Sequence, residues 1–244
     1  MWDTHHYEEP HYFIDRFNFY DNWQEETGNK DVGVLLGEYS VFQIDTPEDI
    51  IDFSMPVDKH IFYPRLLSAI GEGVYALGAE RNPDVVRMSS YAPSLQNFNW
   101  YNWTPNMIAF AASWNDTVLS ASYWQQWMFA RFHGTQSLPV ENSKGDFNPL
   151  FWAASIDEPS NAVYLKVINS GNKTVPLTVD IDAAWSTVNG TILTHEDVNA
   201  FNYLNNKTAV MPKPLDLGAA TPKNGSNFAW TVPAYSITVL QFDL

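Results

Sequence analysis

The segment 32–40 constrains the fold most strongly, because it joins a buried strand to a carboxylate at its end. Residues 32–36 are apolar without alternation, which is typical of a strand buried on both faces, as in a parallel α/β sheet. Gly37 ends the run and Glu38 follows. A charge there is costly unless it faces a polar cavity, and strand carboxyl ends carry the active sites of α/β barrels. The alternative is that Glu38 only caps a strand and pairs with a nearby base.

Composition excludes several classes of protein. With 45% apolar and 17% charged residues over 244 positions, the chain is globular and long enough for one large or two ordinary domains. A net charge of −15 argues against nucleic acid or an anionic membrane surface as partner. No apolar run reaches the roughly 18 residues of a membrane span. Without cysteine there is no disulfide framework, zinc–thiolate site or thiol nucleophile.

Aromatic residues make up 15% of the chain, including ten tryptophans. Aromatic rings often line sugar sites, because one face of a sugar ring is apolar and packs on them. The alternative is that most of these rings belong to a large core.

The first part of the chain alternates strand and helix patterns, which predicts βα units feeding a parallel sheet. Strands are predicted over 1–7, 32–41 and 85–92, and helices over 8–26, 47–53, 64–81 and 122–133. Three parallel strands cannot close a barrel, and both sheet edges would stay open. Either further strands are missing or this part is unstable alone.

The pattern changes at about residue 150. Short alternating stretches follow, separated by Gly, Asn and Pro turns, and predict an antiparallel β-sandwich over 150–244. These stretches are 151–156, 162–169, 175–183, 207–211, 228–232 and 235–243. The predicted domains are therefore 1–149, the C-terminal part of an α/β barrel, and 150–244, the sandwich.

The titratable cluster at the end of the first strand is His5, His6 and Tyr7. A metal site is one interpretation, since histidine is the commonest zinc ligand besides cysteine. Adjacent histidines diverge on extended backbone, however, and no His-Glu-x-x-His spacing follows. Neither a metal nor a cofactor is predicted.

Six N-x-Ser/Thr sequons are present, where about one or two are expected by chance in a chain of this length. The glycosylation candidates are Asn115, Asn172, Asn189, Asn206 and Asn224. Asn102 is a weaker sixth, because Pro105 follows its threonine. The sequons predict a secreted, extracellular glycoprotein. Since the start of the chain lacks the basic-then-apolar layout of a signal peptide, we expect the N-terminus of the parent protein to be missing.

Several motifs together resemble the α-L-arabinofuranosidases of glycoside hydrolase family 51. They are Asp-Thr-His-His-Tyr at 3–7, Gly-Glu-Tyr at 37–39, the long run 80–93, and the stretches 103–108, 197–202 and 232–240. The resemblance covers nearly the whole chain in the expected order. It implies a (β/α)₈ TIM barrel, of which about the last three strands are present, followed by a jelly-roll-like sandwich.

The resemblance also assigns roles to residues in a retaining mechanism. Glu38 falls on the nucleophile, Tyr7 on the tyrosine that orients it, and His5 and Asp3 on substrate-binding positions. Trp103 is a candidate wall of the sugar pocket, with core packing as the alternative. The implied partner is an arabinose-containing polysaccharide or oligosaccharide such as arabinan or arabinoxylan.

The acid/base partner of such a nucleophile is absent from this sequence. The family places it in a Gly-Asn-Glu-Asn-like stretch, and no Asn-Glu pair occurs here. Glu8, Glu9 and Asp3 are the nearest carboxyl groups in sequence, but they lie on or beside the strand of Tyr7. We therefore expect a C-terminal fragment that is inactive alone. The alternatives are a non-catalytic carbohydrate-binding module built on the sandwich, and a truncated gene product that never exists by itself.

Overall fold

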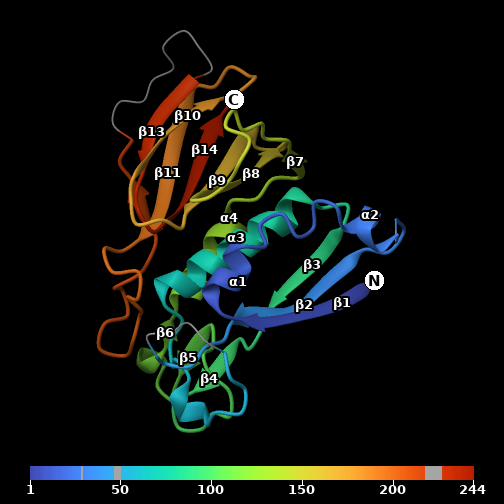
Figure 1. Cartoon of the computed structure of the whole chain (residues 1–244). Helices are drawn as coiled ribbons and strands as arrows, with labels where there is room; N and C mark the ends of the chain where they lie inside the picture. The colour runs from blue at the N-terminus through green and yellow to red at the C-terminus, as the bar shows by residue number, and fades with distance from the viewer. Residues whose placement is uncertain (29, 47–50, 218–226) are drawn as a thin grey trace.

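The computed structural model describes residues 1–28, 30–46, 51–217 and 227–244. Two parts are visible in Figure 1: a small parallel sheet that carries the N-terminus, and a β-sandwich that carries the C-terminus. Helices lie between the two parts. No helix within the described residues is long and apolar enough to cross a membrane.

The parallel sheet contains the three predicted strands in the order β1-β2-β3. They are β1 (Trp2–Glu8), β2 (Val34–Val41) and β3 (Val86–Tyr91), and both pairs are parallel. Tyr39 and Tyr75 are among the buried side chains that pack the sheet against its helices. On the opposite face Asp3 and His5 of β1 are exposed, and the edge strand β3 is exposed at four consecutive positions.

The single helix predicted over 8–26 is wrong. Two short helices, α1 (Pro10–Ile14) and α2 (Trp23–Thr27), are separated by consecutive turns. Asp15, Asn18, Asp21 and Asn22 occupy the turns, and such side chains compete with helical hydrogen bonding. Of the helix predicted over 47–53, residues 47–50 lie outside the described residues and 51–53 are not helical.

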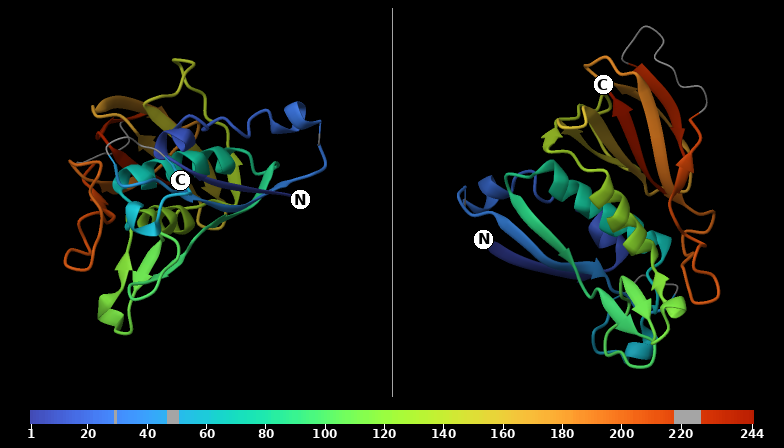
Figure 2. Two further views of the ribbon diagram at one scale, coloured as in Figure 1. Left: turned by 60° about the horizontal axis from the view of Figure 1, so that its bottom comes forward. Right: turned by 180° about the vertical axis from the view of Figure 1, so that it is seen from behind.

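Helix α3 (Leu66–Arg81) is buried on nearly all sides, because it lies between the two parts of the molecule (Figure 2). Tyr75 and Ala79 face the parallel sheet, while Leu66, Ile70 and Val74 belong to a core shared with the sandwich. Helix α4 (Ala121–Arg131) contributes Met128 and Phe129 to that shared core. The helices predicted over 64–81 and 122–133 are confirmed with ends shifted by one or two residues.

The sandwich has a six-stranded sheet in the order β12-β11-β14-β9-β8-β7 and a two-stranded sheet, β10-β13. Its strands are β7 (Gln136–Leu138), β8 (Leu150–Asp157), β9 (Ala162–Asn169), β10 (Val175–Asp180), β11 (Thr187–Thr194), β12 (Lys213–Leu215), β13 (Asn227–Val232) and β14 (Ser236–Asp243). All their pairings are antiparallel. Strand β7 precedes residue 150 and pairs with β8.

Two strand assignments in the sandwich differ from expectation. Residues 207–211 form no strand, because the Asn202 side chain holds them by bonding both the N–H and the C=O of Val210. Strand β11 was not predicted, since Asn189 and Gly190 in its centre resemble a turn. The structure needs that glycine, because a Cβ there would press on the Leu215 side chain of the neighbouring strand.

A third small sheet, absent from the predicted elements, lies beyond the carboxyl ends of the parallel strands (Figure 1). It consists of β4 (Leu95–Asn97), β5 (Ile108–Phe110) and β6 (Val118–Leu119). The single-turn helices η1 (Val57–Lys59) and η2 (Trp114–Asp116) lie in the neighbouring loops. The loop between β4 and β5 carries Trp103.

Candidate active site

A bulge in β2 places Glu38 beside His5. Along β1 and β2, Thr4 pairs with Leu36 and His5 with Glu38, so Gly37 is the extra residue without a partner. The pairing of β2 with β3 shifts at the same place. Bulges re-aim side chains and occur often beside active sites. Here the bulge turns the carboxylate toward the open face of the sheet, where its side chain is 40% exposed.

Four side chains converge at this point. The Tyr7 hydroxyl donates a short hydrogen bond to Glu38 Oε2, and His5 Nδ1 lies 3.3 Å from the same oxygen. The other imidazole nitrogen of His5 lies 3.3 Å from Asp3 Oδ2. Alternation along β1 puts Asp3, His5 and Tyr7 on one face. The structure therefore brings together the four residues that the sequence motifs singled out on the first two strands.

Gly37 lies directly against the side chains of Asp3 and His5. A Cβ at this position would collide with the Asp3 carboxylate and would lie 3.1 Å from His5 Nε2. A glycine leaves Asp3 and His5 in these positions over the bulge, whereas a Cβ would displace the Asp3 carboxylate. The Gly-Glu pair is thus explained by local packing as well as by the placement of the carboxylate.

The Tyr7 hydroxyl stays protonated. Burial, and then the hydrogen bond to Glu38, raise the pKa of the Tyr7 phenol well above its ordinary value. Tyr7 is therefore a hydrogen-bond donor at any physiological pH, and Glu38 is the acceptor. This hydrogen bond fixes the orientation of the Glu38 carboxylate.

Trp103 borders this cluster. Its ring centroid lies 4.7 Å from that of Tyr7 and 6.0 Å from that of Phe42, and 39% of the residue is exposed. Trp103 therefore packs on Tyr7 and still presents surface to solvent. Trp103 is therefore not a core residue, and its role as a wall of a sugar pocket stays a prediction.

The neighbouring titratable residues of β1 and α1 point elsewhere. His6 faces the helices, where its Nδ1 lies 3.0 Å from the Tyr12 hydroxyl and burial lowers its pKa. Glu9 caps α1 by accepting a hydrogen bond from the N–H of His11. No group of three potential metal-ligating side chains occurs among the residues that the structure describes.

Glu72 is a buried acidic residue that the sequence motifs did not indicate. Its Oε1 accepts hydrogen bonds from the N–H of Val41, at 2.8 Å, and the hydroxyl of Tyr91, at 3.2 Å. Burial raises its pKa to about 7. Val41 ends β2 and Tyr91 ends β3, so Glu72 ties α3 to both strands at the end of the sheet that carries Glu38. A glutamate within an otherwise apolar helical pattern is the one sequence signal for it.

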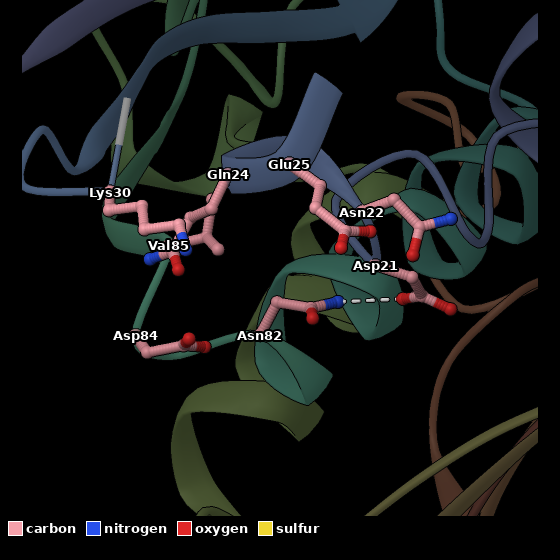
Figure 3. Close-up of a pocket in the computed structure, with 8 residues that line it drawn as sticks. All are labelled: Asp21, Asn22, Gln24, Glu25, Lys30, Asn82, Asp84 and Val85. Atoms are coloured by element: carbon pink, nitrogen blue, oxygen red, sulfur yellow. Dashed lines mark hydrogen bonds between the residues drawn. The ribbon is translucent and has the colours of Figure 1, made fainter. Parts of the chain in front are cut away.

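A cavity of about 250 Å³ lies at the opposite end of the sheet. Asp84 and Val85, just before β3, and Lys30, before β2, are among its lining residues (Figure 3). Asp21 is held there by Asn82 Nδ2, at 2.8 Å, and by Arg81. Since this is the amino end of the parallel strands, we assign the cavity to structure and not to the Glu38 site.

The sequons lie on the surface wherever the structure describes them. Asn115, Asn172, Asn189 and Asn206 are exposed, and Asn224 lies outside the described residues. Asn102 is exposed too, but its Thr104 is buried and donates to backbone carbonyls.

Comparisons with known proteins agree with this architecture. The model of the α-L-arabinofuranosidase C-terminal domain family matches residues 37–236. The chain is 35% identical over 238 residues to a probable α-L-arabinofuranosidase A of Aspergillus niger and 32% identical over 240 residues to that of Aspergillus oryzae. Each match covers 98% of this chain and 33% of the relative, so the chain spans about a third of the length of these proteins.

Solved structures give the same assignment. An arabinose-bound α-L-arabinofuranosidase, MgGH51, superimposes with a TM-score of 0.83 at 28% identity over 99% of this chain and 36% of the other. The family 51 enzyme of Xanthomonas axonopodis pv. citri, at 17% identity, shares the fold with a TM-score of 0.73, over 98% of this chain and 52% of that one. The fold and site define the C-terminal portion of a glycoside hydrolase. The chain belongs to the α-L-arabinofuranosidase C-terminal domain family, and it corresponds to the C-terminal portion of the family 51 enzymes.

Proposed function

We propose that this chain supplies the nucleophile half of a retaining α-L-arabinofuranosidase, with Glu38 as the nucleophile. The observation that carries the proposal is the convergence of Tyr7 and His5 on one carboxylate oxygen of Glu38, at the carboxyl end of the parallel strands. Its relatives are named α-L-arabinofuranosidases, and the structure of MgGH51 contains bound arabinose, which together support the proposed substrate class. Release of terminal arabinofuranose from arabinan or arabinoxylan is the proposed activity of the complete enzyme.

The proposed chemistry follows from the residue types. The Glu38 carboxylate attacks the anomeric carbon, a C–O ester bond forms, and the glycosidic C–O bond breaks. Tyr7 orients the attacking group through its hydrogen bond. Asp3, His5 and Trp103 lie around Glu38, where hydroxyl groups and the apolar face of the sugar would contact them. No cofactor takes part in this step.

The leaving oxygen needs a proton, which in retaining enzymes comes from a second carboxyl group about 5–5.5 Å from the first. The sequence has no residue in the Gly-Asn-Glu-Asn context, and Glu9 is occupied as a helix cap. We therefore propose that the isolated chain does not hydrolyse polymeric substrate.

The experiment tests nucleophilic attack by Glu38 separately from protonation of the leaving group, because it uses a substrate whose leaving group needs no proton. A dinitrophenyl α-L-arabinofuranoside expels a phenolate that leaves without a proton, so attack by Glu38 alone should leave one pentosyl ester on the chain. Mass spectrometry of peptides should locate it on Glu38. Glu38→Gln should abolish the label, and Tyr7→Phe should slow labelling about tenfold to a hundredfold, as for other positioning groups.

Glu9→Gln is the matched control, because it changes a nearby carboxylate that caps α1 and should leave labelling unchanged. Labelling that survives Glu38→Gln, or that falls equally in Glu9→Gln, would contradict the assignment of the nucleophile.

The sequons support a second, independent proposal, which concerns secretion. The four described candidates on the surface are accessible to glycan, and we propose that the parent protein is secreted. Expression in a fungal secretory host and intact-mass measurement before and after glycosidase treatment would test this directly.

A further inference from the structure

The pairing between β2 and β3 is interrupted where β2 carries the proposed nucleophile. Gly37 and Glu38 have no partner in β3. Pairing resumes at Tyr39, opposite Tyr91, and β3 ends at that residue. On this side, the backbone that follows Glu38 therefore has little support from a neighbouring strand.

Glu72 of α3 takes the place of β3 at this point. The Tyr39 carbonyl accepts a hydrogen bond from the N–H of Ala92 at 3.4 Å, so the polar groups of Tyr39 face β3. Residues two apart in a strand direct their backbone groups to the same side, so the N–H of Val41 points past the end of β3. It donates to Glu72 Oε1 at 2.8 Å. A buried N–H without an acceptor is costly, so Glu72 replaces the missing strand partner.

The same carboxylate oxygen also holds the end of β3. The Tyr91 hydroxyl donates to Glu72 Oε1 at 3.2 Å, and the Glu72 residue is 0% exposed. The Tyr91 ring lies with its centroid 5.9 Å from that of Tyr39, the residue that follows Glu38. Glu72 therefore contacts the strand after the proposed nucleophile and the aromatic packing beside it.

Glu72 is the group in this cluster that can change charge near neutral pH. Burial raises its pKa to about 7, and the Ser122 hydroxyl of α4 partly opposes this. Burial and the Glu72 charge raise the pKa of the phenols of Tyr39 and Tyr91, so both stay protonated. Glu80, two turns further along α3, is held in an ion pair with β9. Among the described residues, no cation acts on the pKa of Glu72.

We propose that Glu72 is a positioning residue for Glu38, because its carboxylate holds the end of β2 where β3 stops, and that protonation of Glu72 weakens this hold. The inference rests on the function proposed above. An ionised acceptor makes stronger hydrogen bonds than a neutral one, so the charged form binds Val41 and Tyr91 more firmly. Burial of that charge costs more than these bonds contribute, which is why the pKa is raised and not lowered.

The test is the pH dependence of Glu38 labelling by the dinitrophenyl arabinofuranoside. In the unmodified chain, the rate should rise about threefold as Glu72 ionises, with a midpoint near pH 7. Glu72→Gln keeps the shape and one accepting oxygen but carries no charge, so it should keep the low-pH rate at every pH. Tyr91→Phe removes a donor that favours the charged form, and should shift the midpoint to higher pH.

Glu158→Gln is the control for loss of one negative charge, because Glu158 is exposed in the turn between β8 and β9. It should leave the midpoint and the rise unchanged. A purely structural role for Glu72 predicts that Glu72→Gln slows labelling by the same factor at every pH. That result, or a pH profile identical to that of the unmodified chain, would overturn the inference. Circular dichroism of each variant across the pH range checks that the fold is retained.

NMR of the backbone amides separates this inference from the proposed function. The amide proton shifts of Val41 and Glu38 should change with a midpoint near pH 7 in the unmodified chain, and Glu72→Gln should abolish this change. Labelling of Glu38 without such a titration would overturn the role of Glu72 alone. Titration of both amides without labelling at any pH would overturn the nucleophile and leave the hold of Glu72 on the strand end.

Discussion

The parallel sheet and the sandwich differ in how completely their strands are covered. Strand β9 of the sandwich is buried along its whole length, whereas β3 of the parallel sheet is exposed at four consecutive positions. Parallel sheets are normally covered on both faces. Here helices cover one face, and both edges of β1-β2-β3 lack a strand partner among the described residues. The candidate site therefore lies on the parallel sheet, which has one uncovered face. The sandwich is the fully covered part, and α3 packs on both.

Helix α3 is what connects the two layers. Its buried side chains belong to the cores of both, so the sandwich is not closed without it. This bears on the interpretation of 150–244 as a self-contained carbohydrate-binding module. Phe151, Ile168, Ile237 and Val239 form a core with residues of α3 and α4, which that segment lacks.

The largest effect should come from removing these helices. A chain reduced to residues 150–244 exposes that apolar surface, and we expect it to aggregate or to lack cooperative thermal unfolding. Calorimetry and size-exclusion chromatography of the short and full chains provide the comparison. A monomeric 150–244 fragment with a sharp transition would show that the sandwich is independent of the barrel part.

The second effect concerns the ion pair that joins the layers. Lys166 of β9 is 1% exposed, and its ammonium lies 2.5 and 2.7 Å from the two Glu80 oxygens of α3. Glu80→Ala leaves a buried cation unpaired and should cost about 3 to 5 kcal/mol. Lys166→Met removes the buried charge and leaves Glu80, whose side chain is 34% exposed and can be hydrated, so it should cost less, about 1 kcal/mol. Equal losses from the two variants in urea unfolding would contradict this.

The third effect is pH-dependent. Burial raises the pKa of Glu72 from 4.5 to about 7, so the folded chain binds this proton more tightly than the unfolded chain. Protonated Glu72 makes its full contribution to the free energy of unfolding below about pH 4.5. As the pH rises to 7, this contribution falls by up to about 3 kcal/mol. Glu72→Gln should remove this part of the pH dependence. Urea titrations of both proteins between pH 4.5 and 8 measure it, and parallel curves would refute it.

The smallest effect on stability should come from Gly37, which is compared here with a second glycine, Gly134. A Cβ at Gly134 would collide with the backbone of Ile156 in the sandwich, which cannot move, so Gly134→Ala should cost about 3 kcal/mol. A Cβ at Gly37 would meet the tip of the Asp3 side chain, which faces solvent and can swing away. Gly37→Ala should therefore cost less than about 1 kcal/mol, yet slow labelling of Glu38 by disturbing His5. A larger loss of stability from Gly37→Ala than from Gly134→Ala would contradict this difference between the parallel sheet and the sandwich.

Local patterns predicted the regular elements well and the irregular ones badly. The apolar spacing of 64–81 and the alternation of 162–169 correspond to α3 and β9 almost residue for residue. The aromatic spacing of 8–26 suggested a single helix, although its rings serve two different cores: Phe17 packs toward the sandwich and Tyr20 toward the parallel sheet. A periodicity count cannot show that neighbouring residues face separate layers.

The sequence by itself determined that the chain joins a parallel α/β part to an antiparallel one, and it singled out Glu38, Tyr7 and His5 as members of one candidate site. Those conclusions depend on residue types and their local order. Only the tertiary structure decided that α3 belongs to both cores, that Glu72 ties it to two strand ends, and that Trp103 packs on Tyr7. These residues are brought together by packing across the chain, and no local pattern encodes which distant side chain will fill the space beside them.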